Sequence, residues 1–173
     1  MKKALLAFAA GTVVFGASAA DGTFAGSNII GGVRQYVYDV DGTTKLAKAN
    51  GAVQFVYNGA VVGAGTYGFL QDGIFSAGTI SIPGHAGQTV AITIEVWDKT
   101  RAATYDQIVN EVGTHYLFPQ TVSITLGGVG SPPSTPAALT GFTGGRLFLL
   151  PEPSTIALAA LGLGGLLFVS RRK

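Results

Sequence analysis

The chain has 173 residues, of which 47% are hydrophobic and 12% are charged, and it contains no cysteine. The missing thiols exclude disulfides, cysteine-ligated zinc, iron–sulfur clusters and thiol nucleophiles. Five of the eleven Lys and Arg residues lie at the two chain ends, so residues 21–149 carry six basic and eight acidic side chains and lack the basic surface of a nucleic-acid-binding protein.

The first twenty residues have the organisation of a secretory signal peptide. Lys2 and Lys3 form a basic start, and residues 4–15 form an apolar stretch that is too short to span a membrane comfortably. Residues 17–20 place small side chains where a signal peptidase accepts them. We therefore expect residues 1–20 to be removed; the alternative is an N-terminal membrane anchor.

The body, residues 21–149, alternates apolar and polar residues with a period of two, which indicates strands with one buried face. The predicted strands are Val33–Val40, Ala52–Tyr57, Ile74–Ile82, Gln88–Trp97, Thr121–Leu126 and Arg146–Leu150. The predicted turns between them are Asp41-Gly42, Asn58-Gly59, Asp72-Gly73 and Pro83-Gly84. This pattern predicts an antiparallel β-sandwich, either immunoglobulin-like or jelly-roll-like.

One short helix is expected between the strands. Thr104 and Gln107 have the spacing of a capping box, and the apolar residues that follow share one helical face up to Gly113. The pattern predicts a helix over Thr104–Val112. Residues 127–145 are rich in Gly, Pro, Ser and Thr and are predicted to form a loop before the last strand.

The body offers few residues for metal binding. His85 and His115 are thirty residues apart and lack the spacing of a metal-ligand motif, so we expect both in loops or at strand ends. Asp39 and Asp41 raise the alternative of a calcium loop, but a hairpin turn at Asp41-Gly42 explains the same residues. We expect no metal and no cofactor.

The body also lacks a recognisable catalytic motif. No serine lies in a GxSxG turn and no glycine cluster has the arrangement of a phosphate loop. A hydrolase remains an alternative if carboxylates converge in space, the candidates being Asp72, Glu95, Asp98, Asp106 and Glu111. We expect a non-catalytic protein.

Trp97 is the residue for which we predict a ligand surface. Strand alternation places it on the outward, polar side of its strand, where an aromatic ring stacks on sugars. Tyrosines that would extend such a surface are Tyr36, Tyr38, Tyr57, Tyr105 and Tyr116. This gives an alternative function, a carbohydrate-binding or adhesion module of a polysaccharide matrix.

The last 24 residues have three parts. Residues 150–154, with the sequence LPEPS, form an extended segment because neither proline fits inside a helix. Residues 156–169 are uncharged and, as a helix, reach about 21 Å, which is less than the roughly 30 Å of membrane hydrocarbon. Residues 171–173 are basic and are expected to stay cytoplasmic with the body outside. A marginal span behind an exposed tripeptide indicates a signal that a membrane peptidase reads; the alternative is a plain anchor.

These residues closely resemble the PEP-CTERM protein-sorting domain, with Leu150 where that motif usually begins with Val. The resemblance implies an exported protein of a Gram-negative bacterium and an integral-membrane exosortase as partner. The implied roles are recognition by Pro151, Glu152, Pro153 and Ser154, anchoring in the inner membrane by 156–169, and a membrane stop at Arg171, Arg172 and Lys173.

The resemblance also implies a route. The body is first held in the periplasm by the membrane helix and then reaches the cell surface or the extracellular matrix. A Gram-positive LPxTG signal has the same layout, but Pro153 and Ser154 stand where that motif needs Thr and Gly. The sequence therefore predicts a non-catalytic surface or matrix protein that is sorted through its tail.

Overall fold

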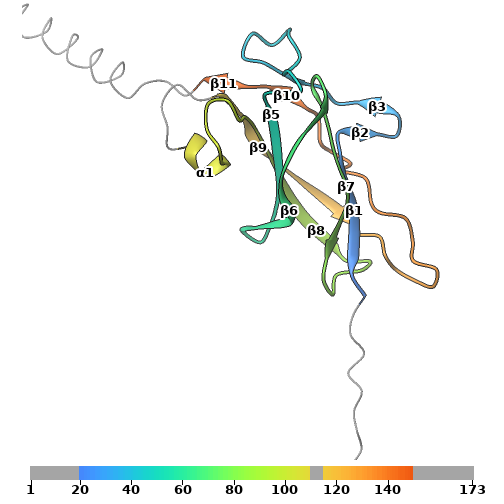
Figure 1. Ribbon diagram of the computed structural model, residues 1–173. Helices are drawn as coiled ribbons and strands as arrows, with labels where there is room; N and C mark the ends of the chain where they lie inside the picture. The colour runs from blue at the N-terminus through green and yellow to red at the C-terminus, as the bar shows by residue number, and fades with distance from the viewer. Residues whose placement is uncertain (1–19, 110–114, 150–173) are drawn as a thin grey trace, which may run out of the picture.

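The computed structural model describes residues 20–109 and 115–149, which form a curled β-sheet with one short helix at its side (Figure 1). The strands are β1 (Gly22–Ser27), β2 (Ile29–Ile30), β3 (Val33–Arg34), β4 (Val37–Tyr38), β5 (Gly51–Tyr57), β6 (Ala60–Gln71), β7 (Ile74–Ile82), β8 (Thr89–Asp98), β9 (His115–Thr125), β10 (Gly145–Arg146) and β11 (Phe148–Leu149). Helix α1 is Tyr105–Ile108. The predicted signal peptide lies, except for its last residue, outside the described residues, as does the whole C-terminal tail.

The main sheet has seven strands in the order β1-β7-β6-β5-β8-β9-β11, and each neighbouring pair is antiparallel. The sheet curls so far that β1 returns to the segment after β9. The backbones of Thr23 and Gly127 exchange two hydrogen bonds, of 3.1 and 2.9 Å. The nitrogen of Ala25 donates a third, of 2.7 Å, to the carbonyl of Ala137. The sheet is therefore closed at one end, like a small barrel.

The antiparallel β-class predicted from the sequence is confirmed, but the expected pair of separate packed sheets is replaced by this single curled sheet. β-Bulges interrupt the ladders of β1, β5, β6 and β8. A bulge bends its strand and increases the local twist. Alternation in the sequence shows that one face of each strand is buried, but it does not show whether the facing strand belongs to a second sheet or to the same one.

The core fills the inside of the curl. The four alternate residues of β8, Val90, Ile92, Ile94 and Val96, all face it, and none is more than 7% exposed. Aromatic rings occupy its centre: Phe75 packs edge-on against Phe55 and Phe142, with ring centroids 6.1 and 5.6 Å apart. The apolar residues predicted by period-two alternation in β8 therefore form the core.

Turn residues position the strands as the sequence predicts. Asn58 and Gly59 both have positive φ angles, of 49° and 76°, and join β5 to β6 as a two-residue hairpin loop. Asp72 and Gly73 also form a two-residue loop, which joins β6 to β7. Gly42 turns the chain between β4 and β5, with its nitrogen 2.9 Å from the carbonyl oxygen of Asp39.

Three strands, β1, β2 and β6, were not predicted, and one prediction was too short. β1 and β6 are rich in glycine and alanine, and only Phe69 of the twelve residues of β6 is buried, so the alternation is weak. β9 begins at His115, six residues before the predicted start at Thr121. The predicted strand Val33–Val40 is divided into β3 and β4.

Helix α1 starts where the capping signal predicts. Thr104 is the residue before its first turn, and the side-chain oxygen of Gln107 accepts the Thr104 backbone N–H at 3.2 Å. The helix is a single turn that ends at Ile108. Residues 110–112 of the predicted helix lie outside the described residues.

Candidate functional site

The predicted sorting residues, from Pro151 to Lys173, lie outside the described residues. The part of the chain that the structure describes contains no helix long and apolar enough to cross a membrane. The last described residue, Leu149, belongs to β11, which pairs with the start of β9. The predicted sorting motif therefore begins directly after the last strand of the sheet.

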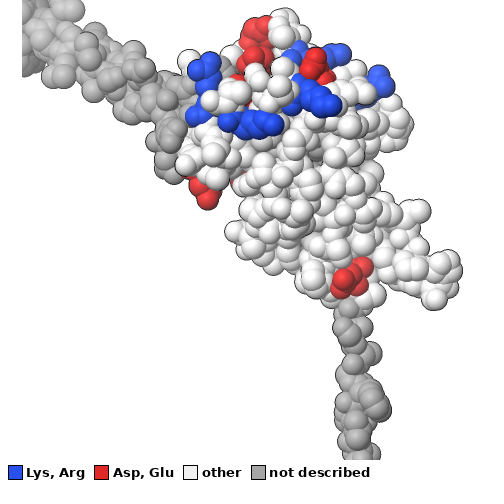
Figure 2. Space-filling model, in the orientation of Figure 1, with Lys and Arg blue, Asp and Glu red and all other residues white. Residues whose placement is uncertain are grey.

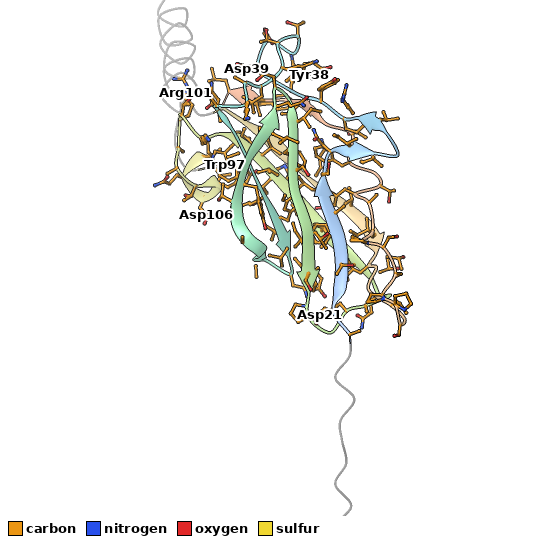
Figure 3. All side chains as sticks on the ribbon, turned by 45° about the vertical axis from the view of Figure 1, so that its right-hand side comes forward. Asp21, Tyr38, Asp39, Trp97, Arg101 and Asp106 are labelled. Atoms are coloured by element: carbon orange, nitrogen blue, oxygen red, sulfur yellow. The ribbon has the colours of Figure 1, made fainter. Side chains whose placement is uncertain are left out.

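Trp97 does not form an exposed stacking surface, so that prediction is wrong. The side chain does lie on the outer face of the sheet, as alternation predicted, but it is 0% exposed. The segment that includes α1 covers it, and Trp97, Tyr105 and Ile108 form a second apolar cluster (Figure 3). The indole N–H donates to the carbonyl of Ala102 at 3.2 Å. Strand periodicity gives the face on which a residue lies, but it does not show that the following helix folds back over this face.

Beside Trp97, the same face holds a half-buried carboxylate. Glu95 accepts a 2.6 Å hydrogen bond from the side-chain amide of Gln54 on β5. Burial raises the pKa of Glu95, and the negative charge of Asp106 on α1 raises it further. The pKa of Tyr105 is also raised, first by burial and then by the charge of Glu95. Glu95 and Asp106 are thus close enough to interact electrostatically, across the contact between α1 and β8.

The hydroxyl group of Tyr105 is buried, and among the described residues it has no hydrogen-bond partner. A buried polar group without a partner is unfavourable. The contact between α1 and β8 is therefore not fully satisfied in its polar interactions.

Two other carboxylates considered for a hydrolase, Asp72 and Asp98, each accept hydrogen bonds from a different loop. Asp72, at the β6–β7 turn, accepts the backbone N–H of Lys48 at 2.7 Å. Asp98, at the end of β8, is buried and accepts both the backbone N–H and the hydroxyl of Thr100. Glu111 lies outside the described residues. In the part of the chain that the structure describes, no three His, Asp or Glu side chains are grouped so that they could hold a metal ion.

The Asp39–Asp41 segment forms a turn stabilised from within. One carboxylate oxygen of Asp41 accepts the backbone N–H groups of Thr43 and Thr44 at 2.9 and 2.8 Å. The hydrogen bond from the Thr44 hydroxyl, followed by these backbone bonds, lowers the pKa of Asp41 to about 2. A calcium loop would need the Asp41 carboxylate as a ligand, but this carboxylate already accepts hydrogen bonds within the turn.

The two histidines lie at opposite ends of the β8–β9 pair, because Thr89 pairs with Thr125 while Trp97 pairs with Tyr116. The Nδ1 atom of His85 is 2.6 Å from the carbonyl oxygen of Pro83, and its ring packs edge-on against Tyr57. His115 is the first residue of β9. The structure does not bring them together.

The exposed part of the outer sheet face is lined by hydroxyl groups instead of aromatic rings. The hydroxyls of Thr89 and Thr125 are 2.8 Å apart, and those of Thr93 and Thr121 are also 2.8 Å apart. These pairs connect β8 and β9 across the face. The sequence shows alternating threonines in both strands, but their pairing depends on the register.

Comparison with protein families identifies a PEP-CTERM protein-sorting motif over residues 150–173. The prediction made from residues 150–154, the short apolar run and the basic end is thus confirmed. PEP-CTERM proteins are exported and sorted to the cell surface, and the motif implies exosortase processing and a membrane-anchored C-terminus in general. No curated protein and no solved structure matches the chain.

Proposed function

We propose that residues 21–149 form a non-catalytic surface or extracellular-matrix protein that an exosortase sorts through its C-terminal tail. The sorting motif at residues 150–173 is the observation that carries this proposal. Residues 1–20 act as the export signal. Residues 156–169 then hold the chain in the inner membrane with the body in the periplasm, until processing releases the body to the cell surface.

The sequence around the motif supports the order of these steps. The two prolines that flank Glu152 keep the tripeptide extended and out of the membrane helix, so a peptidase at the membrane surface can bind it. The fourteen-residue apolar run is a marginal span, which fits a temporary anchor better than a permanent one.

The use of carboxylates in the body supports the non-catalytic role. Asp41, Asp72 and Asp98 each accept backbone N–H groups of nearby loops. Glu95 is paired with Gln54 beneath α1. The three aspartates stabilise loops, which is a role expected of carboxylates in a structural protein.

The test is the processing of the tail in an exporting host. Glu152→Ala and Pro153→Ala are each expected to leave export intact and to block removal of the tail, because they change the recognised tripeptide. Pro133→Ala, which changes an exposed proline of the body, is the matched control and should be processed like the parent chain. Intact-mass measurement of surface-located protein gives the answer. Residues 156–173 still present on the parent protein at the surface would contradict processing and leave a simple anchor.

A polysaccharide-binding role is the second candidate, and it would depend on the hydroxyl-lined face of β8 and β9. Pairs of threonines at fixed spacing present donors and acceptors to a sugar chain. Glycan binding that survives Trp97→Phe and is lost in the double variant Thr93→Val with Thr121→Val would support this role. Binding that is unaffected by the threonine changes would contradict it.

A further inference from the structure

On the face seen in Figure 2, the Lys and Arg side chains gather at one end of the molecule, here called the cationic pole. Its members are Arg34, Lys45, Lys48, Lys99, Arg101 and Arg146, and each is exposed. They are scattered over more than a hundred positions of the sequence, so no linear cluster reveals them. The fold brings them together.

Backbone and ring contacts join the first half of the pole. Arg146 on β10 pairs with Tyr38 on β4, and Tyr38 bridges to Lys45. The ammonium group of Lys45 lies 3.9 Å from the centre of the Tyr36 ring. A hydrogen bond with Arg34, together with the nearby charge of Lys45, lowers the pKa of Tyr36. Three parts of the chain thus present three of these basic side chains together.

The second half of the pole is formed where β8 ends. The backbone N–H of Lys99 donates to the carbonyl of Asn50 at 2.8 Å, and the backbone N–H of Lys48 donates to the carboxylate of Asp72. The backbone N–H of Arg101 closes the turn that follows β8 by donating a 3.1 Å hydrogen bond to the carbonyl of Asp98. Gly73, beside Asp72, bonds to Leu46 and Val37 and so connects this half to the first.

The charge on the rest of the molecule has the opposite sign. The pole itself contains four acidic residues, Asp39, Asp41, Asp72 and Asp98, and each accepts a backbone N–H of a nearby loop. Among the described residues, six basic against four acidic side chains leave the pole with an excess of two positive charges. Away from it, the charged residues that the structure describes are Asp21, Glu95 and Asp106, all acidic, and Figure 3 shows Asp21 at the opposite end from Arg101. The body is therefore electrically polarised along its length.

The chain leaves the body for its tail at this same pole. Phe148 pairs with Tyr116 at the end of the sheet, and the guanidinium of Arg146 lies 5.3 Å from the Phe148 ring centre. Only residues 150–155 separate Leu149 from the apolar run. Six residues at full extension reach about 20 Å, so a tail in the membrane keeps the pole near the lipid headgroups.

We propose that the cationic pole rests on anionic lipid headgroups while the tail is in the membrane. This inference rests on the proposed function for the tether. The attraction to anionic headgroups acts within a Debye length of about 8 Å, so it acts on the pole and not on the acidic residue Asp21 at the opposite end. The contact orients the body upright and keeps residues 151–153 at the membrane surface, where the sorting peptidase works.

The absence of cysteine allows the contact to be measured with single labels. Ala47→Cys places a fluorophore at the pole, and Ala60→Cys places one at the far end of the β5–β6 hairpin; both positions are exposed. Each variant of the full chain is reconstituted into phosphatidylcholine vesicles with or without phosphatidylglycerol, which carry an acceptor dye on a headgroup. We expect phosphatidylglycerol to increase energy transfer from the label at position 47 and not from the label at position 60. The increase should vanish at about 1 M salt, where the Debye length is about 3 Å.

Charge variants separate this contact from simple tethering. Lys45→Gln, Lys48→Gln and Lys99→Gln are each expected to lower the ratio of docked to undocked molecules about fivefold. Lys→Arg at the same positions keeps the charge and should keep the docking. The emission of the buried Trp97 reports whether each variant is folded.

The outcomes distinguish the two proposals. If both kinds of vesicle retain the protein and energy transfer from position 47 is the same with and without phosphatidylglycerol, the lipid contact is overturned and the tether stands. Retention only by vesicles with phosphatidylglycerol supports the lipid contact and contradicts the tether. No retention by either contradicts both. If a soluble anionic polysaccharide abolishes energy transfer from position 47 while phosphatidylglycerol has no effect on it, the pole is assigned to the matrix and the lipid contact is overturned.

Discussion

Asn28 is a fully buried polar residue whose hydrogen bonds connect two hairpins. Its side-chain amide nitrogen donates to the carbonyls of Gln35 and Gly73 at 2.7 and 2.9 Å. Its side-chain oxygen accepts the backbone N–H of Phe75 at 2.9 Å. The β2–β3 hairpin and the β6–β7 turn are therefore joined by one side chain, and nothing in the sequence pattern singles this residue out.

Asn28→Ala is expected to reduce the free energy of unfolding by about 3 kcal/mol, since buried backbone groups lose their partners. Chemical denaturation followed by Trp97 fluorescence measures the change. Asn50→Ala, at a half-buried asparagine, is the control and should alter the stability by less than about 1 kcal/mol. Equal stability of the two variants would show that the bonds of Asn28 contribute little.

Trp97 acts in packing, and its substitution tests that role. Trp97→Ala is expected to destabilise the fold by about 3–5 kcal/mol, because the second apolar cluster loses its largest member. Trp97→Phe should cost less, since an aromatic ring remains against Tyr105. Denaturant midpoints followed by far-ultraviolet circular dichroism give the comparison. A stable Trp97→Ala variant would mean that the indole is not part of the packed structure.

At the scale of elements, the contact between α1 and β8 depends on pH. The raised pKa of Glu95 means that the folded state favours its protonated form. The stability contributed by this group is therefore present below its unfolded pKa and is lost as pH rises through the folded value. Asp106 adds to the effect, because its negative charge lies on the helix that covers this face.

Glu95→Gln is expected to remove this dependence, because glutamine stays neutral and still accepts the bond from Gln54. Its advantage in stability over the parent chain should grow as pH rises above the ordinary pKa of a glutamate and through the raised pKa of Glu95. Asp41→Asn is a control of opposite sign. The lowered pKa of Asp41 makes its contribution disappear as pH falls from about 4 toward 2. Denaturation curves at stepped pH measure both, and parallel profiles of the parent and Glu95→Gln would refute the proposed coupling.

The closure of the sheet between β1 and the segment after β9 shapes the whole molecule. Gly127 allows the following loop to pack against this closure, since a Cβ atom there would overlap the carbonyl oxygen of Thr135, two residues before Ala137, which bonds to β1. The absence of a side chain at Gly127 is thus a requirement of the closed form. Gly68, in the middle of β6, has open space at its Cβ position and no positive φ.

Gly127→Ala is expected to destabilise the protein by about 2–3 kcal/mol, because the backbone must move to relieve the overlap. Gly68→Ala is the matched control and should be neutral or slightly stabilising, since alanine lowers the entropy of the unfolded chain. Hydrogen exchange at the amides of Thr23 and Gly127 reports closure directly. Protection of both amides in Gly127→Ala would show that closure does not need the glycine.

Local patterns were enough to predict much of this protein. Alternation in β8 gave its core residues, Asn58-Gly59 gave a hairpin turn, and Thr104 with Gln107 gave the start of α1, because each feature depends on neighbours in the sequence. The sorting motif was also predictable, since a peptidase reads it as a linear string. β6 was missed because its glycines and exposed residues leave no periodic signal.

By itself, the sequence determined the strand faces, the turns and the sorting motif, which depend on residues within a few positions of one another. Tertiary structure decided which outer faces are covered, and it buried Trp97 beneath a helix that the strand pattern cannot place. It also closed the sheet through Gly127 and gathered six scattered cations at the end where the chain continues toward its tail. Register and curl bring together residues that are distant in the chain, and such contacts have no local signature.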